Sequence, residues 1–337
     1  MTFAMPAPHP FARFVNILGR GKTLTRSLTV EEAEEAMSMI LADDVRPEQL
    51  GAFLMLLRVK EESPEEIAGF VRACRKAMAL PSPLPKVDID WSSYAGKKRQ
   101  LPWFILAAQL LARNGWRVFM HGTDGHTEGR LYTKDTLERL GMPVAANFAE
   151  AAGHLEARNF AYLPLEGISM KLQEMLGLRN ILGLRSPVHT LARKLNPFGA
   201  PAMLQSVFHP GYMDIHQKAG AILEQPHMAV FRGEGGEIER RPNKPTEVKT
   251  LHNGVLSSEQ WPAIIPEPRQ TPEENMDVAR LPALWAGEIT DEYAEAAITG
   301  TVAIALKLVG RTDAMDDAQA QAEALWTARD RSKPLTA

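Results

Sequence analysis

Hydrophobic positions recur at helical spacing through the first part of the chain. Two amphipathic runs each follow a capping box, Thr29 with Glu32 and Ser63 with Glu66, in which a glutamate stands three positions after a hydroxyl residue. A third helix is predicted between them, over residues 47–59. The pattern predicts a helical domain over residues 1–82, and the proline-rich residues 80–85 mark its end.

From residue 86 onward, short apolar runs alternate with helical ones. Strands are predicted at 87–91, 117–120, 160–165, 202–208 and 228–231, and helices at 103–113, 133–140, 212–223 and 293–308. This alternation is typical of an α/β domain with a mostly parallel central sheet flanked by helices. We predict that this domain comprises residues 86–167 and 196–337. We assign a returning segment, about residues 168–195, to the helical domain.

Composition adds limits on chemistry and location. A chain of 337 residues with 45% hydrophobic residues can bury the cores of about two domains. Its one cysteine, Cys74, falls on the apolar side of a predicted helix, which predicts a buried, inert thiol. There is no run of 18 apolar residues and no signal-peptide pattern, so we expect a cytoplasmic protein without a membrane partner.

The charges are distributed unevenly, although the net charge is only −3. Residues 91–123 and 175–213 contain nine bases and no acid. Several Lys and Arg side chains on one face are sufficient to bind a phosphate backbone. The alternative is ordinary solvated surface, in which acids from elsewhere neutralise these bases. The candidate nucleic-acid-binding residues are Lys97, Lys98, Arg99, Arg179, Arg185, Arg193 and Lys194.

Aromatic residues stand beside the first group of bases. Trp91 and Tyr94, if exposed, would provide stacking surfaces for single-stranded bases, and packing in the core is the equal alternative. Trp103 precedes an apolar helix and is expected in the core. A further basic cluster, which neighbouring glutamates partly neutralise, comprises Arg240, Arg241, Lys244 and Lys249.

Metal and catalytic chemistry have little support in the sequence. The segment from His121 to Glu128 contains two histidines and two acids, but glycine-spaced polar residues after a strand are common in ordinary loops. We predict no metal site and no catalytic residue.

Several segments resemble the anthranilate phosphoribosyltransferases, the TrpD-like members of glycosyl transferase family 3. They are Leu28-Thr-Val-Glu-Glu-Ala33, residues 49–60, Pro64-Glu-Glu-Ile-Ala-Gly69 and Met120-His-Gly122. The resemblance implies a fold of the nucleoside phosphorylase/phosphoribosyltransferase type. It also implies a homodimer that pairs through the helical domain.

The chain departs from this family at the substrate site. The family binds the pyrophosphate of phosphoribosyl pyrophosphate (PRPP) with a loop, Gly-Thr-Gly-Gly-Asp, whose glycines permit close backbone approach. Here Trp91-Ser-Ser-Tyr-Ala-Gly-Lys-Lys-Arg99 replaces that loop. Gln173 and Glu174 stand where an arginine would hold the acceptor carboxylate. Glu234 and Glu237 replace the adjacent Asp-Glu pair for magnesium. The expected vestigial substrate cleft comprises Trp91, Ser92, Tyr94, Gly96, His121 and Gly122.

The segment Asp90-Trp-Ser-Ser-Tyr94 is similar to the Asp-Trp-x-Ser-Tyr motif of the YbiB-type paralogues, which are described as nucleic-acid binders. The resemblance therefore implies a protein that binds DNA or RNA, single- or double-stranded, without sequence specificity and without a cofactor. One alternative is an active phosphoribosyltransferase with an altered acceptor. Lys97, Lys98 and Arg99 would then bind PRPP through side chains, with Mg²⁺ as cofactor. Another is a small-ligand sensor or partner-binding scaffold.

Overall fold

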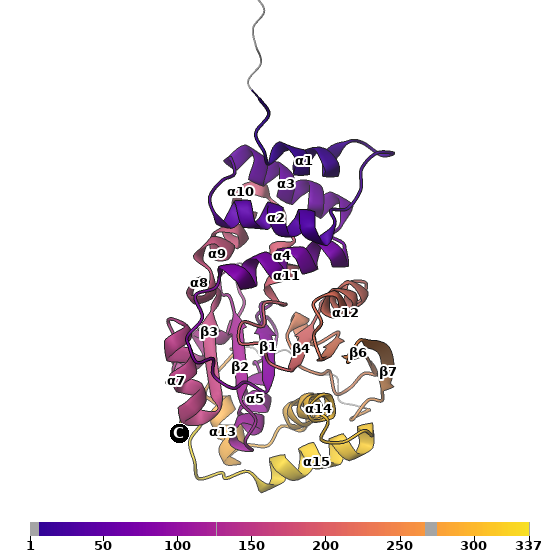
Figure 1. The fold of residues 1–337 in the computed structure, drawn as a ribbon. Helices are drawn as coiled ribbons and strands as arrows, with labels where there is room; N and C mark the ends of the chain where they lie inside the picture. The colour runs from indigo at the N-terminus through magenta and orange to yellow at the C-terminus, as the bar shows by residue number, and fades with distance from the viewer. Residues whose placement is uncertain (1–6, 126, 267–274, 337) are drawn as a thin grey trace, which may run out of the picture. The chain divides into compact units, whose positions relative to one another are not determined.

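The computed structural model describes residues 7–125, 127–266 and 275–336. Its internal contacts divide the chain into two compact units, and each unit combines two separate segments (Figure 1). The helical unit consists of Met1–Met78 and Glu174–Leu195, and the α/β unit consists of Ala79–Gln173 and Asn196–Ala337.

The helical unit takes most of its helices from the N-terminal segment. These are α1 (Ala12–Gly19), α2 (Val30–Leu41), α3 (Pro47–Lys60) and α4 (Pro64–Ala77). The returning segment adds α10 (Arg179–Leu182) and α11 (Val188–Ala192), and α11 contacts α4. Helix α9 (Met170–Gly177) spans the boundary between the units along the chain.

Both predicted capping boxes form. Thr29 and Glu32 exchange the two hydrogen bonds of a capping box at the start of α2, and Ser63 and Glu66 do the same at the start of α4. Glu66 is buried and also accepts a hydrogen bond from the Leu28 N–H at 2.9 Å. The second box therefore ties α4 to the segment before α2. Cys74 is buried on α4, which confirms that prediction.

The α/β unit is built on a sheet with the strand order β3-β2-β1-β4-β5-β6-β7. Strands β1 to β5 run parallel, whereas β6 and β7 are antiparallel, so the predicted mostly parallel sheet is confirmed. The strands are β1 (Ile89–Ser93), β2 (Val118–Gly122), β3 (Phe160–Pro164), β4 (Ala202–Ser206), β5 (His227–Phe231), β6 (Thr246–His252) and β7 (Val255–Trp261).

Helices cover both faces of this sheet. One large hydrophobic core joins one face to α5 (Phe104–Arg113), α13 (Arg280–Ala286), α14 (Glu292–Leu308) and α15 (Met315–Ala328). A smaller core on the alternate positions joins the other face to α12 (Tyr212–Ile222) (Figure 1). The remaining helices of the unit are α6 (Thr133–Arg139), α7 (Phe148–Arg158), α8 (Leu165–Ile168) and the 3₁₀ turn η1 (Glu234–Gly236).

The order of the strands reverses at β1, which pairs with β2 on one side and with β4 on the other. In open parallel sheets, the loops at the carboxyl ends of the strands beside such a reversal form the usual ligand site. Here those loops begin at Tyr94, Thr123, Val207 and Arg232. In the part of the chain that the structure describes, no helix is long and apolar enough to cross a membrane.

Candidate functional site

Trp91 in β1 and Tyr94 directly after it are part of the protein interior. Trp91 is 0% exposed and Tyr94 is 1% exposed, so neither offers a surface on which a base could stack. The Tyr94 hydroxyl lies 2.8 Å from His121 Nδ1, and His121 Nε2 lies 3.4 Å from Asp90 Oδ2. Trp103 is buried as predicted. The stacking interpretation of Trp91 and Tyr94 is therefore wrong, because both side chains are buried.

The end of β1 and the loop that follows it provide a set of donors that we call the cradle: the N–H groups of Ala95 and Gly96 and the hydroxyl of Ser93. Both N–H groups donate to Glu237 Oε1 at 2.6 Å, and Ser93 Oγ donates to Glu237 Oε2 at 2.9 Å. Glu237 is 1% exposed. A carboxylate from the loop after β5 therefore occupies the donors at the carboxyl end of β1.

Lys97 is not available to an external phosphate in this structure, which corrects its place among the predicted nucleic-acid-binding residues. It is 1% exposed, and its ammonium group donates to Glu239, which is 0% exposed. Glu239 also accepts from the Phe104 N–H at 2.9 Å. Burial raises the pKa of Glu239, and the nearby Lys97 charge opposes that rise. Lys97 thus serves the stability of the fold.

The predicted bases of the second acid-free window belong to the helical unit. Arg185 is exposed, Arg179 and Arg193 are half-buried, and Arg193 Nη1 donates to the His189 carbonyl at 2.7 Å. Lys194 is 0% exposed, so the prediction is corrected there as well. The backbone carbonyl of Lys194 accepts from Arg75 Nη2 at 3.1 Å, which anchors this turn against α4. The bases of the two windows therefore lie in different units.

Lys98 and Arg99 remain exposed and line a pocket of ≈ 370 Å³, here called the Lys98 pocket. Its lining residues are Lys97, Lys98, Arg99, Gln100, Arg130, Phe208, Glu234 and Gly235. These come from the loops after β1, β2, β4 and β5, which meet at the carboxyl edge of the sheet.

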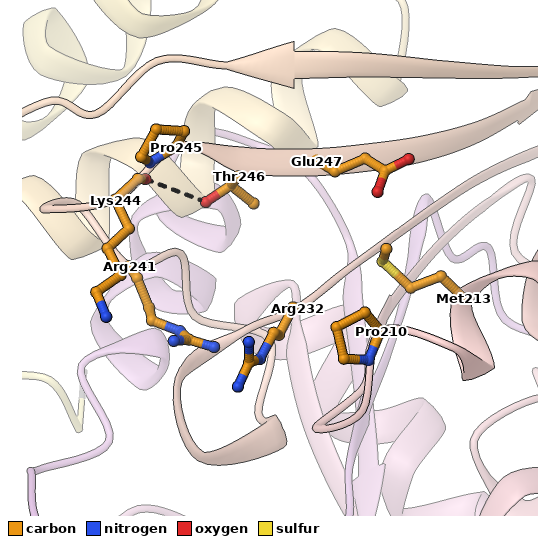
Figure 2. A pocket seen from close by; sticks show the side chains of 8 residues that line it. All are labelled: Pro210, Met213, Arg232, Arg241, Lys244, Pro245, Thr246 and Glu247. Atoms are coloured by element: carbon orange, nitrogen blue, oxygen red, sulfur yellow. Dashed lines mark hydrogen bonds between the residues drawn. The ribbon is translucent and has the colours of Figure 1, made fainter.

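A second pocket of ≈ 180 Å³, the Arg232 pocket, lies on the same edge. It is lined by Pro210, Met213, Arg232, Arg241, Lys244, Pro245, Thr246 and Glu247 (Figure 2). Arg241 Nε lies 3.6 Å from Glu234 Oε2 of the Lys98 pocket, so the two pockets adjoin. Burial lowers the pKa of Arg241. The Glu234 carboxylate opposes this shift and the Arg232 charge adds to it.

Arg130 and Arg232 line the two pockets but were not among the binding residues predicted from the sequence. Arg232 directly follows β5, and its position at the carboxyl end of a parallel strand was the signal that could have found it. The four residues of the further basic cluster have different environments. Arg241 and Lys244 line the Arg232 pocket, whereas Arg240 is buried with its guanidinium carbon 5.0 Å from the Trp261 ring centroid. Lys249 pairs with Asp214.

The groups at the positions where the family binds Mg²⁺ and PRPP already make hydrogen bonds and ion pairs within the protein. Both carboxylate oxygens of Glu237 accept from the cradle, and Glu234 pairs with Arg241. No group of three or more His, Cys, Asp and Glu side chains in the described residues could hold a metal ion. His126, part of the segment considered for metal binding, lies outside the described residues. In this conformation the residues do not fit that cofactor arrangement.

Comparison with known proteins shows a clear relationship. The helical bundle domain of the glycosyl transferase family matches residues 13–78. The chain is 30% identical over 315 residues to the anthranilate phosphoribosyltransferase of Moorella thermoacetica, covering 88% of this chain and 89% of that protein. It is 27% identical over 245 residues to the uncharacterized protein YbiB of Escherichia coli, covering 72% and 76% of the two chains.

Solved structures confirm the predicted fold. Anthranilate phosphoribosyltransferase (TrpD) from Thermus thermophilus superposes with a TM-score of 0.76 at 22% identity and covers 95% of both chains. The Saccharomyces cerevisiae enzyme in complex with PRPP and Mg gives a TM-score of 0.76 at 18% identity, covering 94% of this chain and 93% of that one. At these identities the likeness concerns the fold alone.

Proposed function

Because this chain belongs to the glycosyl transferase family of the anthranilate phosphoribosyltransferases, we propose that it uses this scaffold to bind nucleic acid through the phosphate backbone, without sequence specificity. The observation that supports the proposal most directly is the pair of adjoining cationic pockets. Besides Lys97, which Glu239 neutralises, six Lys and Arg side chains line them against two carboxylates, an excess that favours a polyanion over a single small anion.

The exposed members of this set are Lys98, Arg99, Arg232 and Lys244. Flexible Lys and Arg side chains bind phosphates by charge, and they release counterions in doing so. Such contacts position a strand but carry no information about its bases. This is the reason that we expect affinity to depend strongly on salt and weakly on sequence.

Phe208 supports a preference of the protein for single-stranded over double-stranded nucleic acid. It is 51% exposed and lines the Lys98 pocket beside Lys98 and Arg99. Its ring centroid lies 4.9 Å from that of His209. An exposed aromatic ring among cations is what binding of unpaired bases requires, because every base has a stacking face. Phe208 thus takes the role that the sequence suggested for Trp91 and Tyr94.

Fluorescence anisotropy with single- and double-stranded oligonucleotides over a range of salt tests the proposal. We expect binding whose affinity falls linearly with salt on logarithmic axes. Replacing both Lys98 and Arg99 by alanine should reduce the magnitude of the single-strand salt slope by about 1.4, because each lost phosphate contact removes about 0.7. The pair Arg232→Ala and Lys244→Ala should act similarly.

A matched control removes the same charge from the opposite edge of the sheet. Lys86 and Arg117 precede β1 and β2, so the pair Lys86→Ala and Arg117→Ala should leave the slope unchanged. Equal losses in the control and test pairs would mean that binding follows net charge alone. Absence of binding at low salt would contradict the proposal itself.

A phosphoribosyltransferase with an altered acceptor is the second candidate. It is favoured by the 30% identity to an anthranilate phosphoribosyltransferase across most of the chain. The size of the Lys98 pocket also falls within the usual range of small-molecule sites.

Thermal unfolding with PRPP and Mg²⁺ separates the two candidates. A binding enzyme at 100 times its Kd would gain about 2.7 kcal/mol of unfolding free energy. The nucleic-acid proposal predicts no shift with micromolar PRPP and a clear shift with oligonucleotide. A PRPP shift accompanied by release of pyrophosphate in the presence of an acceptor would replace our proposal with the enzymatic one.

Homodimer formation through the helical unit and a cytoplasmic location stay predictions. The helical unit leaves Val59 and Ile181 79% and 80% exposed, and apolar side chains of that kind suit an association face. Two copies would double the phosphate contacts available to one strand.

A further inference from the structure

We propose that His227 and His252 form a binding site for a divalent transition-metal ion such as Zn²⁺, at the edge of the sheet opposite to the two pockets. His227 begins β5 and His252 ends β6, and the two residues are partners across this antiparallel pair. The pockets lie at the carboxyl ends of the parallel strands, whereas β5 begins at the other edge. The site is therefore separate from the surface proposed for nucleic acid.

The two imidazole rings have the spacing of ligands to one metal ion. His227 Nδ1 lies 3.1 Å from His252 Nδ1, and the ring centroids are 5.2 Å apart. Two histidine nitrogens that each lie about 2.0–2.1 Å from one ion are about 2.9–3.4 Å apart, for bond angles between about 90° and 109°. The observed separation lies within that range. Rotation of the rings would bring both lone pairs onto one ion without any movement of the strands.

Without a metal ion, the pair shares one proton. A hydrogen bond between two neutral imidazoles needs Nδ1–H on one ring and a lone pair on the other. When an ion takes both Nδ1 atoms, the ring that carried this proton changes to its Nε2–H tautomer by exchange with water. Both rings stay neutral, so binding releases no net proton.

The surroundings favour neutral rings. Burial lowers the pKa of His252, the charges of His227 and Lys307 lower it further, and the Glu259 carboxylate opposes the shift. A neutral imidazole is the form that binds metal. Lys307 on α14 and Glu259 on β7 form an ion pair at 3.0 Å, so their charges largely offset each other beside the histidines.

Backbone hydrogen bonds hold both histidines in place. The His227 N–H donates to the Pro201 carbonyl at 3.0 Å, and the N–H of Asn253, directly after His252, donates to the Pro226 carbonyl at 2.7 Å. Ligands on paired strands are positioned more firmly than ligands on a loop. Both histidines are half-buried, so an ion can reach them from solvent.

The donor atoms select the class of ion. Imidazole nitrogens suit Zn²⁺, Cu²⁺ and Ni²⁺, whereas Mg²⁺ and Ca²⁺ prefer oxygen ligands. Among the described residues no third His, Cys, Asp or Glu joins the pair, so water or an external ligand would complete the coordination. The prediction of no metal site considered the segment from His121 to Glu128, and these two histidines lie outside that segment.

Zn²⁺ is the probe, with affinity measured by titration calorimetry on the full chain. His227→Gln and His252→Gln each leave one imidazole, so the tightest Zn²⁺ site of the wild type should weaken at least about tenfold in either variant. His154→Gln is the matched control. His154 is a half-buried histidine on α7 of the same unit, and its replacement should leave the Zn²⁺ affinity unchanged.

Nitrogen NMR of the histidine rings locates the ion in the wild type. Zn²⁺ should shift the Nδ1 signals of His227 and His252 and leave those of His154 unchanged. Mg²⁺ at the same concentration should shift none of them. This measurement decides the question if the glutamine variants do not fold.

The proposal is overturned if the wild type binds no Zn²⁺ at millimolar concentration, because the pair would then be a hydrogen bond only. It is also overturned if both glutamine variants bind Zn²⁺ within about twofold of the wild type. Zn²⁺ shifts confined to other histidines would overturn it as well, since the ion would then lie elsewhere. The oligonucleotide titration, carried out with a chelator present, is independent of all three results.

Discussion

The Gly122→Ala variant is expected to lose about 3 kcal/mol of unfolding free energy, the upper part of the usual range for overpacking. A Cβ atom at Gly122 would lie 1.9 Å from the Ser93 carbonyl oxygen and 3.1 Å from the Tyr162 hydroxyl. The first of these is backbone of the neighbouring strand β1, so it cannot turn away as a flexible side chain would. The strands would have to separate at the edge that carries the cradle.

Urea unfolding followed by tryptophan fluorescence measures this loss in the correct unit, because all six tryptophans belong to the α/β unit. Gly153→Ala is the matched control. Gly153 lies in α7 with nothing within 4 Å of its added Cβ, so this variant should gain about 0.5–1 kcal/mol. A Gly122→Ala midpoint equal to that of the wild type would mean that the two strands do not approach so closely.

The Glu239→Ala variant should cost about 3–5 kcal/mol, because it leaves the buried Lys97 ammonium without its carboxylate. Lys97→Ala should cost a similar amount for the reciprocal reason. The double variant Lys97→Met and Glu239→Leu should cost less than either single change, since no charge then remains buried. It retains a penalty of about 1–3 kcal/mol for the Phe104 N–H, which loses its acceptor.

The same fluorescence measurement on Lys97→Ala, Glu239→Ala and the double variant with alanine at both positions gives the coupling between the two positions. A double-variant loss equal to the sum of the single losses would show that Lys97 and Glu239 act independently. That outcome would return Lys97 to the candidate binding residues, because its charge would not be committed to Glu239.

Local sequence signals predicted the elements well. The hydroxyl and glutamate pairs at Thr29 and Ser63 placed the starts of α2 and α4, because a capping box satisfies its donors within four residues. The hairpin of β6 and β7 was missed although Asn253-Gly254 is a strong signal for a two-residue turn.

Local sequence signals could not predict which of the neighbouring basic residues are buried and which are exposed. Lys97 forms an isolated antiparallel bridge with Leu131, and in extended backbone successive side chains point to opposite sides. Lys97 therefore points inward and Lys98 outward. The direction depends on a partner strand, and the acid that neutralises Lys97 lies 142 residues further along the chain. Glu237 and Gly96 are 141 residues apart in the chain, so the contact between Glu237 and the cradle could not be predicted from local sequence either.

The division of the helical unit between two chain segments has a consequence during synthesis. Arg75 Nε on α4 donates to the Leu195 carbonyl at 2.8 Å, and the Thr190 hydroxyl donates to Glu62 at 2.6 Å. The helical unit of a nascent chain therefore lacks its second segment until residue 195 has emerged from the ribosome. By then β1, β2 and β3 have already been made. An N-terminal fragment that ends at Met78 would lack the second segment of the helical unit permanently. The surface that this segment covers would stay exposed, and chaperones would bind it.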